Sequence, residues 1–201
     1  VLWFLMGYGV VDGALQAVED NNSSLLAAIG SGIAIIFAPL GWVGDMAWKA
    51  TTATFTGLIA KEEVVNFFGV AYHYAGEADL MEDASGIYAA VGADFGAMAA
   101  YSFMIFNLLC APCFAAMGAI KREMNNVKWT LGAIGYMCGF AYVVSLIVFQ
   151  LGGLVTGEAA FGIGTIAALV LLVGILYLLF RKGYQGEENT RRLSSVAAAV
   201  Q

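Results

Sequence analysis

Two cysteines flank a proline inside an apolar stretch. Residues 106–113 read Phe-Asn-Leu-Leu-Cys-Ala-Pro-Cys, which places Cys110 and Cys113 on either side of Pro112. Proline removes a backbone N–H and interrupts helical hydrogen bonding. In a bilayer, such a break is tolerated only where protein or a water-filled cavity covers the freed carbonyl groups. Because thiol sulfur is a soft ligand, this break predicts a place where a metal ion pauses along a path.

A second chemical feature is the charged triplet Lys61-Glu62-Glu63 within the mostly apolar residues 46–74. A charge at the centre of a bilayer costs about 2.5–3.5 kcal/mol even on the milder scales, so the triplet should face protein or water. On a helix, Asn66 would share a side with both carboxylates, and the three side chains would attract a cation. The alternative is that two short elements are joined by a solvated turn at the triplet.

The cysteine pair also has other interpretations. A redox motif needs a soluble βαβ context, and a structural zinc site needs four ligands, so the sequence favours neither. The alternative to an ion path is that the thiols are inert and fill space at a helix kink. Cys138 lies in a separate apolar run and is interpreted as a small buried hydrophobe.

Composition identifies a membrane protein. The chain has 201 residues, of which 61% are hydrophobic and 12% are charged, against roughly 45–50% and about 25% in soluble domains. The apolar segments are long and continuous, which predicts helices and not barrel strands. We therefore expect an all-α, polytopic transmembrane bundle. The net charge of −6 argues against nucleic-acid binding.

The two prolines of the chain, Pro39 and Pro112, both interrupt apolar segments. Broken segments in two halves of a chain are typical of transport sites. The run 25–38 is short for a full span of about 20 residues. It either crosses with residues 42–43 included or re-enters the membrane as a half-helix, so the bundle should contain broken or re-entrant helices.

Loop charges predict the topology. The segments 121–128 and 181–192 carry Lys and Arg, whereas the loops 12–24, 75–94 and 152–160 carry none. Basic loops stay in the cytoplasm, so we expect six crossings, the first ending at residue 11, with a cytoplasmic C-terminus. Residues 1–182 should form the membrane region, cut from a larger protein, and 183–201 a disordered polar tail.

Several motifs resemble one family. These are Ala-Pro-Leu-Gly-Trp at 38–42, Thr-Gly-Leu-Ile-Ala-Lys-Glu at 56–62, Leu-Leu-Cys-Ala-Pro-Cys at 108–113 and Ala-Ile-Lys-Arg-Glu at 119–123. In order and spacing they are similar to the membrane part of ferrous-iron transport protein B (FeoB). The resemblance runs to about residue 182 and corresponds to the second gate region through to the C-terminus.

The resemblance implies Fe²⁺ transport across the bacterial inner membrane. Family members carry a G-protein domain that uses GTP and Mg²⁺, but its phosphate-binding Gly-x-x-x-x-Gly-Lys-Ser/Thr loop is absent from this sequence. This chain is then a transporter part and not itself an enzyme. The implied partners are the lipid bilayer, the rest of the transporter chain and small cytoplasmic Feo accessory proteins; a homo-oligomer is also compatible.

The resemblance also assigns site residues. Cys113 matches the Pro-Cys cysteine that is a proposed iron contact, and Lys61 and Glu62 match an Ala-Lys-Glu motif. Cys110 departs from the family, which more often has an aromatic residue there. With Glu63 and Asn66 added from the residue chemistry, the expected ion pathway is Cys113, Cys110, Glu62, Glu63, Asn66 and Lys61, and the expected metal ligands are Cys113 and Glu62.

Two other functional classes stay open from the sequence alone. A carrier for nucleosides or another organic solute would also use broken gate helices. A membrane scaffold or receptor would bind partners and transport nothing.

Overall fold

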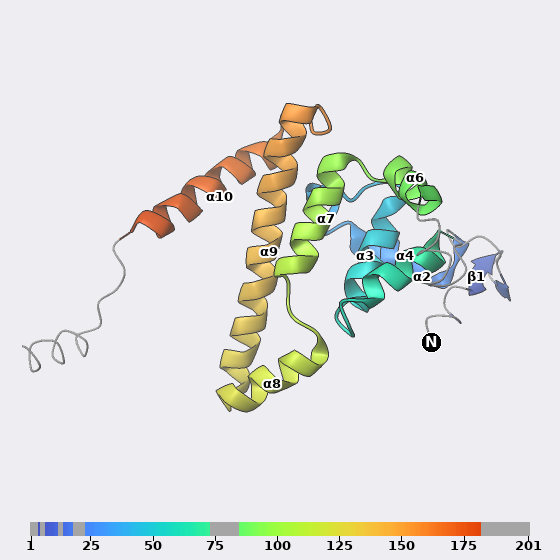
Figure 1. Cartoon of the computed structure of the whole chain (residues 1–201), viewed down its shortest axis with the longest axis horizontal. Helices are drawn as coiled ribbons and strands as arrows, with labels where there is room; N and C mark the ends of the chain where they lie inside the picture. The colour runs from blue at the N-terminus through green and yellow to red at the C-terminus, as the bar shows by residue number, and fades with distance from the viewer. Residues whose placement is uncertain (1–3, 5–6, 12–13, 18–22, 73–84, 182–201) are drawn as a thin grey trace, which may run out of the picture.

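The computed structural model describes residues 4, 7–11, 14–17, 23–72 and 85–181 (Figure 1). It is helical apart from one antiparallel hairpin, β1 (Tyr8–Val11) and β2 (Ala14–Ala17). This confirms the all-α prediction. The helices are α2 (Leu25–Ala34), η2 (Ala38–Leu40), α3 (Met46–Thr56), α4 (Glu63–Ala71), α6 (Ser85–Asp94), α7 (Ala97–Leu109), α8 (Phe114–Met124), α9 (Val127–Thr156) and α10 (Ile163–Phe180).

The prediction that a helical span ends at residue 11 is wrong for residues 8–11, which form β1. Aromatic and β-branched residues such as Tyr8, Val10 and Val11 favour a strand, and the glycines at 7 and 9 weaken a helix. The predicted tail at 183–201 lies outside the described residues.

Three helical segments of the described chain are long and apolar enough to cross a membrane. They are Ala97–Met124, Val127–Thr156 and Ile163–Phe180, and the first is interrupted between α7 and α8. Residues 46–74 do not form one helical crossing, because α3 has 11 residues and α4 has 9. A helix of this length spans only about 15 Å of a core that is ~30 Å thick. The alternative of two short elements holds.

α2 and α3 pack against each other on either side of the Pro39 break, which is the arrangement of a helical hairpin. Ser24 caps the start of α2, as its Oγ accepts from the Ala27 N–H at 3.1 Å. After η2, Gly41 takes a left-handed φ of 86°, and a Cβ there would lie 2.1 Å from the Phe149 ring. The tight turn after Pro39 therefore requires glycine.

Helix α9 supplies hydrogen bonds to the broken hairpin. The Tyr142 hydroxyl donates to the Ile36 carbonyl at 2.7 Å, and Gln150 Nε2 donates to the Pro39 carbonyl at 2.9 Å. Gln150 is buried, and its Oε1 also accepts from the Thr165 hydroxyl of α10 at 3.4 Å. Carbonyl groups that the proline break leaves without helical partners are thus satisfied by side chains, as apolar surroundings require.

Aromatic rings join the broken hairpin to α7. Phe37 stacks on Trp42, with ring centroids 4.6 Å apart, and both meet Phe106 edge-on. Phe103 continues this cluster toward Phe68 of α4. Figure 1 shows the result: α7 lies beside α9, and α2, α3, α4 and α6 lie on the other side of α7. α10 diverges from α9.

The close packing of α2 on α3 in the helical hairpin can be tested by substituting glycines of α2. A Cβ at Gly30 would meet Thr52 Oγ1 at 2.8 Å and the Trp48 carbonyl at 3.1 Å, whereas a Cβ at Gly32 meets nothing within 4 Å. Gly30→Ala should lower the free energy of unfolding by about 1–3 kcal/mol through overpacking. Gly32→Ala should raise it by roughly 0.5–1 kcal/mol through helix propensity.

Thermal unfolding of both variants in the same detergent measures the difference. Equal effects of the two substitutions would contradict the packing of α2 against α3.

A candidate ion pathway at two helix breaks

Two interruptions of the helices meet in space. α3 is followed by a break at 57–62, and α7 is followed by a break at 110–113. The Phe114 N–H, at the start of α8 directly after the second break, donates to the Leu58 carbonyl in the first break at 2.8 Å. One of these breaks follows from Pro112, and the other contains Lys61 and Glu62, the first two residues of the charged triplet.

Lys61 connects the two breaks through its side chain. Its ammonium donates to the Asn107 carbonyl at 2.8 Å and to Cys110 Sγ at 3.2 Å. The Asn107 carbonyl belongs to the last turn of α7, where carbonyl groups lack helical partners and the helix dipole favours a cation. Lys61 and Cys110, both predicted for the pathway, are therefore brought together.

Polar side chains extend this contact into the helix interface. Asn107 Nδ2 donates to Thr54 Oγ1 at 3.2 Å and to the Phe103 carbonyl at 3.0 Å. We call Thr54, Lys61, Asn107 and Cys110 the break cluster. In the part of the chain that the structure describes, Asn107 Oδ1 is buried and has no hydrogen-bond partner.

Sequence reasoning missed Asn107 and Thr54. Asn107 carried a signal, since it is the one amide side chain in the apolar stretch 97–113. Thr54 carried none, because threonine commonly bonds to its own helix, as Thr54 does with the Ala50 carbonyl at 3.0 Å.

The predicted carboxylates lie differently. Glu62 precedes α4 at its N-cap position and is exposed, as is Glu63, while Asn66 is half-buried in the first turns of α4. Cys113 is half-buried at the N-cap of α8. Across residues 23–72 and 85–181, no three His, Cys, Asp or Glu side chains converge on a metal position. A metal shared by Cys113 and Glu62 stays a prediction.

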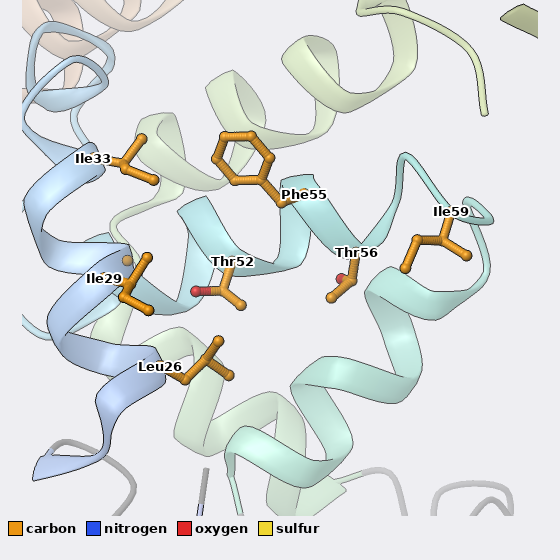
Figure 2. Close-up of a pocket in the computed structure, with 8 residues that line it drawn as sticks. Leu26, Ile29, Ile33, Thr52, Phe55, Thr56 and Ile59 are labelled. Atoms are coloured by element: carbon orange, nitrogen blue, oxygen red, sulfur yellow. The ribbon is translucent and has the colours of Figure 1, made fainter. Parts of the chain in front are cut away.

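A pocket of about 250 Å³ opens between α2 and α3 and reaches Ile59 in the first break. Figure 2 shows Thr52 and Thr56 on α3 facing the aliphatic side chains of α2. The Thr56 hydroxyl donates to the Ala53 carbonyl at 2.8 Å, so it is satisfied within its own helix. The lining is otherwise apolar and suits a hydrophobic group better than an ion. It consists of Leu26, Ile29, Gly30, Ile33, Thr52, Phe55, Thr56 and Ile59.

A second polar network holds the short helices together. Lys49 of α3 is buried and forms an ion pair with Asp94 of α6, which also accepts from the Tyr72 hydroxyl at 2.8 Å. The Lys49 ammonium lies 4.1 Å from the centre of the Tyr72 ring. Burial raises the pKa of Asp94, but the hydrogen bonds from Lys49 and Tyr72 outweigh it and leave that pKa below its usual range.

This network makes a prediction for stability. Lys49→Met keeps much of the apolar stem but leaves Asp94 without its cation, so it should lower the free energy of unfolding by on the order of 2 kcal/mol. That is less than for a fully buried pair, because the Asp94 side chain is 28% exposed. Lys128→Met, at an exposed lysine, should change stability little. Thermal unfolding in detergent compares the two, and equal losses would show that the ion pair does not stabilise the helices.

Comparison with known proteins places this geometry in a family. Residues 1–127 match the family model "Gate: Nucleoside recognition". The Fe(2+) transporter FeoB of Methanocaldococcus jannaschii is 34% identical over 158 residues, covering 77% of this chain and 22% of the relative. That of Staphylococcus aureus (strain COL) is 34% identical over 157 residues, covering 75% of this chain and 22% of the relative.

A further relative is the Fe(2+) transport protein A/Fe(2+) transporter FeoB fusion protein of Porphyromonas gingivalis. It is 30% identical over 144 residues, which cover 67% of this chain and 16% of the relative. No solved structure matches the chain. The chain spans about a fifth of the length of the curated relatives it matches. Because the family model covers more than half of the residues, the chain belongs to the Gate family, and it corresponds to part of the membrane region of the FeoB transporters.

Proposed function

We propose that this chain forms part of an Fe²⁺ permease and that the ion passes the contact between the two helix breaks. The observation that most directly supports this pathway is that Lys61 connects the two breaks by binding Asn107 and Cys110. The names of the relatives support Fe²⁺ as the substrate.

The chemistry of the breaks suits a transported ion. Fe²⁺ accepts sulfur, oxygen and nitrogen ligands, and the breaks offer thiols and backbone carbonyls. A transport site must also release its ion, so a few ligands serve better than a closed cage. Cys113, half-buried and three residues after Cys110, is the proposed iron contact.

The acidic side chains act outside this contact. Glu62 and Glu63 are exposed at the start of α4, so we assign them to the entrance, where negative charge raises the local concentration of cations. Asn66, on the same helix, would offer an amide oxygen on the way to Cys113. In this proposal the ion moves from Glu62 to Cys113.

The membrane setting follows from the charges of the loops. Lys121, Arg122 and Lys128 lie on or beside the turn between α8 and α9, and Arg181 follows α10. Because basic loops tend to stay in the cytoplasm, the start of α9 and the end of α10 both face the cytoplasm in this proposal. The C-terminus is then cytoplasmic. The proposed location is the inner membrane, with residues 1–182 as the gate region.

Further proposed partners belong to the whole transporter. GTP and Mg²⁺ act in a G-protein domain elsewhere in the full-length protein, and this chain supplies transport and no catalytic residue. The relative whose name joins Fe(2+) transport protein A to FeoB supports a small accessory partner.

A carrier for nucleosides is the second candidate, because the matched family model is described as nucleoside recognition. Uptake by the full-length protein in vesicles separates the two. Excess Co²⁺ should compete with radiolabelled Fe²⁺ and reduce its uptake, since both ions use the same ligand types. Excess adenosine or uridine should leave it unchanged. Inhibition by nucleosides, with no effect of Co²⁺, would favour the second candidate.

The thiol at the second break gives a sharper test. Cys113→Ser should reduce the rate of Fe²⁺ uptake about tenfold, because a hydroxyl is a poorer ligand for this ion than a thiolate. Cys138→Ser changes a half-buried thiol in α9 and should leave uptake near the parent rate. Both are measured at matched membrane expression. A similar rate for the two variants would remove Cys113 from the pathway.

A further inference from the structure

We propose that the Lys61 ammonium is a built-in cation that occupies the break cluster, and that a divalent ion binds there only by displacing it. This inference rests on the proposed function, since it concerns the same pathway. It adds a closed state in which the protein's own side chain fills the ion position.

The ligands around the ammonium are the first argument. Lys61 Nζ lies 2.8 Å from the Asn107 carbonyl oxygen and 3.2 Å from Cys110 Sγ. A lysine ammonium is a compact point charge that offers only donors. The oxygen and the sulfur that accept from it are also the atoms that a divalent transition metal would bind.

The end of α7 is the second argument. The last carbonyl groups of a helix carry partial negative charge and favour any cation, whether an ammonium or a metal ion. Cys110 is itself the residue after α7, and its Sγ also lies 3.5 Å from the Asn107 carbonyl oxygen. The site thus combines a helix terminus with a thiol.

An unsatisfied oxygen is the third argument. Asn107 Oδ1 is buried and, within the described residues, has no hydrogen-bond partner, although the amide nitrogen of the same side chain has two acceptors. Buried polar atoms are normally paired. In the described part of the chain this oxygen is a free acceptor on the residue whose main-chain carbonyl binds the ammonium, and the ammonium does not use it.

The position of Lys61 lets it leave. It lies in the irregular segment between α3 and α4, where no continuous helix fixes its backbone, and it is half-buried. Displacement therefore requires a shift of one short loop and not the unfolding of a helix. The exposed carboxylates at Glu62 and Glu63 adjoin it and can receive the released ammonium.

Binding of Co²⁺ to the full-length protein tests the inference under anaerobic, reducing conditions. Lys61→Met removes the charge and keeps the stem, so Co²⁺ should bind at least tenfold more tightly, with a thiolate-to-cobalt absorption band. These spectra are recorded in a Cys113→Ala background, which removes the thiol that the proposed function also gives to the ion. There, Cys110→Ser added to Lys61→Met should abolish that band. Lys121→Met, at an exposed lysine of α8, changes the same net charge away from the cluster and should bind Co²⁺ like the parent.

Unchanged affinity in Lys61→Met, or a band that survives Cys110→Ser, would overturn the inference. If Lys61→Met does not fold, alkylation of Cys110 by N-ethylmaleimide is followed in a Cys113→Ala, Cys138→Ala background that retains Lys61. Saturating Co²⁺ should slow alkylation, and an unaltered rate would equally overturn the inference. Uptake that responds to nucleosides instead of Co²⁺ contradicts the proposed function, whereas unaltered Co²⁺ binding contradicts only the role of Lys61.

Discussion

The structure depends on satisfying backbone carbonyl groups where helices stop inside apolar surroundings. Water is scarce there, so each freed carbonyl needs a donor from the protein. Tyr142 and Gln150 supply donors at the Pro39 break of the helical hairpin formed by α2 and α3. Lys61 supplies one at the end of α7, and it is the only one of the three donors that carries a charge. Both breaks leave carbonyl groups without helical partners, but the donors that satisfy these groups are neutral at the first break and charged at the second.

That difference separates a structural break from a functional one. At Pro39 the donors are neutral groups on α9, a continuous helix of 30 residues, and the partnership is fixed by packing. At Cys110 the donor is a cation on a loop, beside a thiol. Replacing the ammonium by a metal ion exchanges one cation for another at the same carbonyl, whereas replacing a neutral amide would bring a new charge into apolar surroundings.

The sequence predicted the breaks at Pro39 and Pro112 because proline acts locally on the chain. For residues 46–74 it left open one long helix or two short ones, since apolar composition does not distinguish them, and the structure has two. The grouping of Glu62 and Glu63 with Asn66 needs only the start of α4, where Glu62 is the N-cap and Glu63 the first residue, and it stays a prediction. The partnership of Lys61 with Asn107, 46 residues away, is a tertiary contact that no local pattern contains.

The Gln150 side chain also joins two parts of the molecule that both pack against α9. Its nitrogen binds the hairpin at Pro39, and its oxygen binds Thr165 near the start of α10. A tilt of α10 must either break the Thr165 bond or rotate the amide, and rotation withdraws the N–H from Pro39. A displacement of α10 is thus coupled, through one amide side chain, to the turn at Pro39.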